Sequence, residues 1–216
     1  MINKETKIYG SFSRQAGNVG CRLFNTSFKF YRLNCIYRSF SVDDIESAVS
    51  AARCLGFSGF AVSMPFKKQI LEHVDSHSPE VLEIGSANTV NVEDGFLKCY
   101  NTDYKAVKEM LESYKKRDLV ILGNGGYAAA IKYAAKQLGY TYEVVTRKSW
   151  SEISQIRDKI IFNATPVKDL HHTVDMLSND FIDCDTDSRT GRILAKTQAA
   201  AQFRIYTNLD FPLRRY

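Results

Sequence analysis

Residues 119–139 read LVILGNGGYAAAIKYAAKQLG, and this stretch decides the fold class. A short apolar strand runs directly into a glycine-rich turn, and a helix of mostly small residues follows until Gly139 ends it. A strand, a glycine turn and a helix in this order predict the start of a parallel, Rossmann-like sheet. Glycines in such a turn let the backbone approach a pyrophosphate, whose charge the helix dipole stabilises. The same pattern also occurs as a tight turn that binds no ligand.

The chain after this stretch continues the alternation in a shortened form. We expect further strands at residues 142–145, 160–162 and 181–184, and a closing helix at about 192–206. Together with the strand at 119–122, these elements make a small Rossmann-like unit.

The chain before it also alternates strand and helix signals. The expected elements are a strand at 7–9, a helix at 23–31, a strand at 35–40, a helix at 45–55, a strand at 59–62, a hairpin of strands at 87–92 and 96–100, and a helix that begins near 103. This order predicts a mostly parallel sheet, in which ligands gather beyond the carboxyl ends of the strands. Residues 63–67 lie at such an end.

The predicted fold is therefore α/β with two domains. Residues 1–101 form a domain with a mostly parallel sheet, and residues 102–187 form a shortened Rossmann-like domain. Residues 188–216 form a C-terminal helix that packs back on the first domain.

Composition restricts the class of protein. The chain has 216 residues, of which 44% are apolar, so it is long enough to bury a core. The net charge of +5 comes from scattered Lys and Arg, so we expect no nucleic-acid partner. No stretch approaches the roughly 18 apolar residues of a membrane span and no signal peptide is visible, so we expect a cytoplasmic protein without a membrane partner. The five cysteines form no C-x-x-C pair and the four histidines match no ligand motif, so we expect reduced thiols and no metal.

The residues after the second Rossmann strand bear on the choice of cofactor. Thr146, Arg147 and Lys148 lie about 20 residues past the glycines, where NAD enzymes usually place an acid and where an Arg accommodates the 2′-phosphate of NADP. Two cations beside a hydroxyl favour NADP(H) over NAD. The alternative is that both charges belong to an ordinary solvated loop.

Lys67 and Asp103 are the candidates for proton transfer. Reduction of a ketone by a nicotinamide needs a positioned acid or base to deliver a proton to the alkoxide. Lys67 follows a strand end and a proline, and Asp103 begins a helix after Asn101 and Thr102. Taken singly, each has an ordinary alternative: most lysines are solvated, and Asp is a common helix cap.

Several motifs in order resemble the shikimate dehydrogenase family. AVSMPFK at 61–67 is similar to N-V-T-x-P-F/H-K, GSANT at 85–89 is similar to G-A-V-N-T, and NTD at 101–103 matches N-T-D. The other matches are GNGGYA at 123–128, TRK at 146–148, NAT at 163–165 and QAA at 198–200. The sequences at 17–20 and 61–67 most resemble the divergent shikimate dehydrogenase-like branch of the family.

This resemblance implies NADPH-linked, reversible reduction of 3-dehydroshikimate to shikimate, or of a related acid such as quinate. Lys67 and Asp103 would be the catalytic pair, and Ser63, Asn88 and Gln198 would hold ring hydroxyls. The implied cofactor-binding residues are Gly123, Asn124, Gly125, Gly126, Tyr127, Ala128, Thr146, Arg147, Lys148, Asn163, Ala164, Thr165 and Gly191. The partner would then be a small hydroxy acid, which binds to the substrate domain at 1–101, while NADP(H) binds to the Rossmann-like domain at 102–187. The chain would be a monomer or a homodimer.

Three departures from the family pattern leave the activity open. The family's carboxylate-binding S-x-S-P aligns with residues 18–21, where Asn18 is the first residue, and Ser11 and Ser13 have the right spacing but lie earlier in the chain. Few residues follow the NAT motif, and residues 183–186 lack the tyrosine of the family's D-x-x-Y. A second hypothesis is therefore a homologue that binds NADP(H) or a shikimate-like acid without useful catalysis.

Overall fold

The computed structural model describes residues 2–212. The chain divides into two compact units at the Thr102–Asp103 and Thr197–Gln198 peptide bonds. The middle part is unit 2, and the parts before and after it form unit 1. Within residues 2–212, no helix combines the length and apolar character that a membrane span requires.

Unit 1 is built on a six-stranded mixed sheet. Its strands in chain order are β1 (Lys7–Ser13), β2 (Cys35–Ser41), β3 (Phe57–Val62), β4 (Ser76–His77), β5 (Thr89–Glu93) and β6 (Phe96–Tyr100). They lie in the order β2-β1-β3-β5-β6-β4. β1 runs parallel to β2 and β3, whereas β5 runs antiparallel to β3 and β6. The predicted parallel strands and hairpin are confirmed, and β4 was not predicted.

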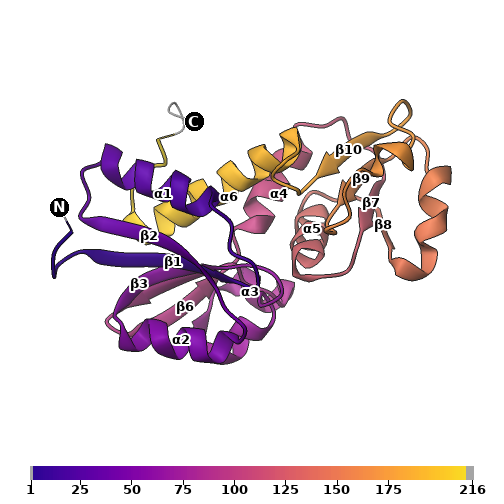
Figure 1. Cartoon of the computed structure of the whole chain (residues 1–216). Coiled ribbons are helices and arrows are strands. Elements are labelled where there is room, and N and C mark those ends of the chain that lie inside the picture. The colour runs from indigo at the N-terminus through magenta and orange to yellow at the C-terminus, as the bar shows by residue number, and fades with distance from the viewer. Residues whose placement is uncertain (1, 213–216) are drawn as a thin grey trace. The chain divides into compact units, whose positions relative to one another are not determined.

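Helices cover both faces of this sheet. They are α1 (Val19–Phe30), α2 (Ile45–Cys54), the 3-10 helix η1 (Gln69–His73), α3 (Pro79–Ile84) and the last part of α6 (Arg189–Thr207). α2 lies on one face, while α1 and α6 lie on the other (Figure 1). Aromatic rings fill the second layer, where Phe24 and Phe28 of α1 pack against Phe203 of α6. α3 was not predicted, because six residues are too few to show a helical period.

Local sequence explains the ends of the elements. The side chain of Asp44 accepts a hydrogen bond from Ser47 N at 2.7 Å and so caps α2, while Gly56, with φ of +66°, ends the turn behind it. In the hairpin of β5 and β6, Asp94 and Gly95 have φ of +50° and +79°. Two consecutive left-handed residues are what a type I′ turn requires.

Side chains of α1 cover the open edge of β2. The Nδ2 of Asn25 donates to Tyr37 O at 2.8 Å, and the Oδ1 of Asn25 accepts from Tyr37 N at 2.9 Å. Two residues further along β2, Ser39 N donates to the Sγ of Cys21 at 3.3 Å. An edge strand otherwise presents such groups to other chains. Here α1 satisfies them.

Unit 2 is a smaller, all-parallel sheet. Its strands are β7 (Leu119–Leu122), β8 (Tyr142–Val145), β9 (Ile160–Asn163) and β10 (Asp180–Asp183), in the order β10-β9-β7-β8. α4 (Asp103–Glu112), α5 (Gly126–Gln137) and the start of α6 share one core with the sheet. The 3-10 helices η2 (Arg147–Gln155) and η3 (Leu170–His172) lie in a second core. The predicted α/β class and shortened Rossmann-like sheet are confirmed.

Candidate functional site

Asn88 is the centre of a buried hydrogen-bond network in unit 1. Its Oδ1 accepts from Thr102 N at 2.7 Å and from Thr89 Oγ1 at 2.9 Å. Its Nδ2 donates to Thr102 Oγ1 at 2.9 Å and to Gln198 Oε1 at 3.2 Å. The side chain of Asn88, whose residue is 2% exposed, therefore joins β5, the residue before α4, and α6. The structure brings together Asn88 and Gln198, both predicted as substrate-binding, and adds Thr89 and Thr102.

The turn that carries Lys67 is attached to the same network through the backbone. Val62 N donates to Asn88 O at 2.8 Å, and Ala87 N donates to Lys67 O at 2.8 Å. The side chain of Phe66 is buried in the core, which fixes the turn from below. Lys67 is half-buried and Ser63, at the start of the turn, is exposed. A buried aromatic and two backbone bonds thus hold the turn that carries Lys67.

Asp103 begins α4 at the point where the chain leaves unit 1. It follows Thr102, whose amide and hydroxyl are both bonded to Asn88. Asp103 is 3% exposed, and a carboxylate in the first turn of a helix is stabilised by the helix dipole. The predicted acid is therefore a buried carboxylate whose preceding residue is fixed by the network.

Ser11 and Ser13, which have the spacing of the family's carboxylate-binding serines, lie on β1. Ser11 is half-buried and forms a side-chain hydrogen bond with Tyr37, and Ser13 is 8% exposed at the end of the strand. Burial raises the pKa of Tyr37 above its usual range, and the bond to Ser11 opposes that shift. Asn18 is exposed at the start of α1, and its side chain makes no capping bond. Tyr37 was missed from sequence, although strand alternation places it beside Ser11.

Two of the three glycines in the turn of unit 2 are suited to their positions for different reasons. Gly123 has φ of +101°, and an added Cβ would lie 2.8 Å from the Cγ2 of Thr165. Gly125 has an ordinary φ of −84°, and a Cβ added there would meet nothing within 4 Å. Gly123 is thus required by the chain itself, whereas Gly125 leaves open space before the first turn of α5. That space suits a ligand that needs close backbone approach.

The remaining residues of the turn are placed by α5. Asn124 is exposed, and its Oδ1 accepts from the Nζ of Lys132 at 2.6 Å. Gly126 is the first residue of α5, Ala128 is fully buried, and burial raises the pKa of Tyr127 well above its usual range. The helix amides at its start therefore face the turn, and an ammonium group lies beside it.

Arg147 and Lys148 follow β8, next to the glycine turn in the sheet. The register pairs Leu122 with Val145, so the residues after both strands come side by side. Thr146 caps η2 through a capping box, whereas Arg147 and Lys148 are exposed. Among residues 2–212 neither cation has a side-chain hydrogen bond or ion pair. Such cations fit an anionic group such as a 2′-phosphate.

Asn163 and Gly191 have roles inside the protein. The Oδ1 of Asn163 accepts from Thr165 N at 3.0 Å and from Thr165 Oγ1 at 2.7 Å, so this residue shapes the loop after β9. Ala164 N donates to Leu122 O at 3.0 Å, which joins the loop to β7. Gly191 lies in α6, where an added Cβ would collide with the carbonyl oxygen of Asp185.

An ion-pair cluster closes the loops after β9 and β10. The Nζ of Lys168 lies 3.0 Å from Asp185 Oδ2 and 2.7 Å from Asp187 Oδ2. Burial raises the pKa of the neighbouring Asp183, which begins the stretch that lacks the family's tyrosine. A lysine held by two carboxylates therefore stands near this part of unit 2.

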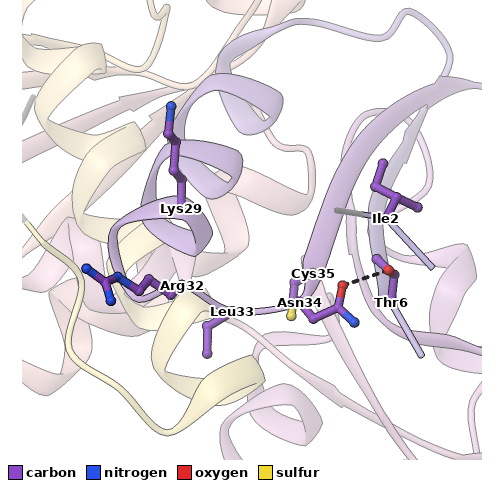
Figure 2. Close-up of a pocket in the computed structure, with 7 residues that line it drawn as sticks. All are labelled: Ile2, Thr6, Lys29, Arg32, Leu33, Asn34 and Cys35. Carbon is purple, nitrogen blue, oxygen red and sulfur yellow. Dashed lines mark hydrogen bonds between the residues drawn. The ribbon is translucent and has the colours of Figure 1, made fainter. Parts of the chain in front are cut away.

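An open hollow of about 460 Å³ lies elsewhere on unit 1, near the starts of β1 and β2. Its lining residues are Ile2, Thr6, Lys29, Arg32, Leu33, Asn34 and Cys35 (Figure 2). Thr6 Oγ1 donates to Asn34 Oδ1 at 2.7 Å, while Lys29 and Arg32 point in different directions. Because its polar groups do not converge and it lies at the amino ends of these strands, we do not regard it as the functional site.

Comparison with known proteins adds to this geometry. Residues 19–90 match the family model described as the shikimate dehydrogenase substrate binding domain. The chain is 39% identical over 143 residues to a shikimate dehydrogenase-like protein of Haemophilus influenzae, covering 65% of this chain and 53% of that protein. It is 33% identical to a shikimate dehydrogenase (NADP(+)) of Chlorobaculum tepidum, covering 77% of this chain and 70% of that protein. The chain thus spans about half of the first relative and more of the second.

Solved structures show the same two-unit fold. A shikimate 5-dehydrogenase-like protein superimposes with a TM-score of 0.80 at 27% identity, over 97% of this chain and 94% of that one. A shikimate dehydrogenase in complex with NADP+ superimposes with a TM-score of 0.78 at 23% identity, over 99% and 94% of the two chains. At that identity the second likeness supports the fold alone. Because the match to the Chlorobaculum tepidum enzyme is 33% identical and covers 70% of that protein, the chain belongs to the shikimate dehydrogenase family.

Proposed function

We propose that this protein is an NADP-dependent oxidoreductase that interconverts 3-dehydroshikimate and shikimate, or a closely related polyhydroxy carboxylate such as quinate. The observation that carries the proposal is the Asn88 network, which joins the turn of Lys67 to the residue before Asp103. A network of this kind supports two proton-transferring groups on well-fixed backbone, which catalysis by positioned groups requires.

The cofactor proposal rests on unit 2. The open space at Gly125 gives room for a pyrophosphate before the first turn of α5, and Arg147 and Lys148 offer exposed positive charge for a 2′-phosphate. These residues fit NADP(H), which when bound supplies or accepts the hydride. Thr146 and the loop of Asn163 to Thr165 would shape the rest of the site.

In the proposed reaction, the residues of this chain bind the acid and handle one proton. Lys67 and Asp103 hold the proton that the substrate oxygen gains or loses. Asn88, Ser63 and Gln198 hold ring hydroxyls, and the bond from Asn88 orients the side chain of Gln198. Hydroxyls of Ser11 and Ser13, with Asn18, are proposed to meet the carboxylate, because the family's serines are absent at 18–21.

Absorbance at 340 nm tests this proposal directly. Purified protein with NADPH and 3-dehydroshikimate, or NADP with shikimate or quinate, should change absorbance. Lys67→Ala should lower kcat by roughly two to four powers of ten, the usual contribution of a positioned acid or base. The affinity of this variant for NADP should stay within about twofold of the wild type, since Lys67 is proposed to transfer a proton and not to bind the cofactor. The matched control is Lys68→Ala, an exposed neighbour that should keep activity. No turnover with any of these substrates would refute the proposal.

A second candidate function is a binder of NADP(H) or of a shikimate-like acid, with no useful turnover. It is favoured by the Lys168 cluster, which lies in a part of unit 2 where the family's tyrosine is absent. Thermal-shift titration separates the two: stabilisation by NADPH but not by shikimate, without turnover, supports the binder.

A further inference from the structure

Gln202 is a buried polar residue of α6 that contacts the centre of the network. It is 2% exposed and lies one helical turn after Gln198. Its Nε2 donates to the backbone carbonyl of Asn88 at 3.2 Å. α6 thus holds Asn88 twice: Gln198 bonds its side chain, and Gln202 bonds its backbone.

The burial of this amide requires its bond. A primary amide removed from water is unfavourable unless it is hydrogen-bonded, whereas the neighbouring Ala199 and Phe203 of α6 are buried without polar groups. The benefit of an amide here is directional, because it fixes where the Asn88 carbonyl points.

Asn88 is hydrogen-bonded to both segments that carry the proposed reacting groups, and its carbonyl makes the first of these bonds. It also accepts from Val62 N at 2.8 Å, and Val62 ends the strand that leads into the turn of Lys67. The side chain of the same residue accepts from the amide of Thr102, which precedes Asp103. A displacement of Asn88 would therefore move both segments.

We propose that Gln202 is a positioning residue for the reaction. It holds the Asn88 backbone so that Asn88 aligns the turn of Lys67 and the start of α4 at Asp103. Gln202 needs no contact with substrate or cofactor to do this. The proposal rests on the proposed function for its kinetic part, and on the Asn88 network alone for its structural part.

Two measurements on Gln202→Met test it, with Gln202→Leu as a second variant if the first folds poorly. Met has the length of Gln and no amide. The control is Thr207→Val, which removes a 2.7 Å bond from Thr207 Oγ1 to Phe203 O on the same helix without contacting Asn88. Hydrogen exchange is followed at the amides of Val62 and Thr102, which donate to Asn88. Steady-state kinetics give kcat and the two KM values.

In Gln202→Met, exchange at these amides should rise by about fivefold, the factor expected when one hydrogen bond is lost. kcat should fall by about 10- to 100-fold, the effect of a misplaced reacting group, while KM for NADP stays within about twofold. A residue that only supports the fold would lower Tm and leave kcat of the folded fraction unchanged. The proposal is overturned if exchange and kcat match those of Thr207→Val. If the wild type has no turnover, the proposed function fails, and exchange alone decides whether Gln202 holds Asn88.

Discussion

Replacing Gly125 by Ala separates ligand binding from folding in unit 2. The backbone at Gly125 has an ordinary φ, and an added Cβ meets no atom of the chain within 4 Å. Alanine there should therefore raise the free energy of unfolding by about 0.4–1 kcal/mol, since it restricts the unfolded chain. For a protein of this size, 1 kcal/mol corresponds to about 2–4 °C in Tm.

The methyl group introduced by Gly125→Ala should also weaken the binding of the cofactor. A methyl forced into a close contact costs about 1–3 kcal/mol, which is about 5- to 150-fold in Kd. Gly123→Ala is the matched comparison, because φ of +101° and the 2.8 Å approach to Thr165 strain any side chain there. It should lower the free energy of unfolding by about 1–3 kcal/mol.

The assay combines thermal unfolding without ligand and titration with NADPH by intrinsic or cofactor fluorescence. The expected pattern is Gly125→Ala with an equal or higher Tm and weaker NADPH binding, and Gly123→Ala with a lower Tm. If Gly125→Ala binds NADPH as tightly as the wild type, the open space at Gly125 does not hold the pyrophosphate. If its Tm falls as far as that of Gly123→Ala, the steric argument itself is wrong.

Arg147→Met should lower the affinity for NADP by about 10- to 150-fold, because a bond to a charged group is lost, and should leave the affinity for NAD unchanged. Fluorescence titration with both cofactors measures this, and an equal loss for both would contradict a 2′-phosphate contact. Asp75 accepts bonds from Arg53, which hold the pKa of its carboxyl below its usual range, so its contribution to stability is present above about pH 4 and is lost as pH falls through the folded pKa. Asp75→Asn should therefore lower Tm at pH 7 and flatten the fall of Tm below pH 4, and an unchanged acid profile would argue against this ion pair. Asn25→Leu leaves two backbone groups of Tyr37 without their partner and should lower the free energy of unfolding by about 1–3 kcal/mol. Urea unfolding measures this, with Asn25→Asp as a milder comparison, and no loss of stability would mean that water replaces the amide.

Local signals were enough to predict most of the fold. The glycine turn at 123–126, the left-handed pair at 94–95 and the helix stop at Gly56 each require a particular backbone, so the sequence shows them directly. α3 and β4 were missed because they are too short to carry a period. No element was predicted at η2, which is a kinked 3-10 segment.

The site was less predictable, because its partners are far apart in the chain. Asn88 was predicted to hold a ring hydroxyl, and the sequence does not show that its Oδ1 is also bonded to Thr89 and Thr102. The bond from Gln202 joins residues 114 positions apart, and no local pattern distinguishes Gln202 from a surface glutamine. The position of Tyr37 could have been predicted from the sequence, since alternation along 35–41 places it on the same face of the sheet as Ser11. The roles of the predicted site residues stay predictions.

The cover that α1 gives to β2 also limits how this protein associates with others. Asn25 and Cys21 supply to the outer side of β2 the bonds that another strand would otherwise supply. A polypeptide that adds to this edge must first displace the helix, so growth of the sheet is coupled to partial unfolding of unit 1. Chemical modification of the Cys21 thiol should weaken its bond to Ser39 N, and with it the cover that α1 gives to this edge of the sheet.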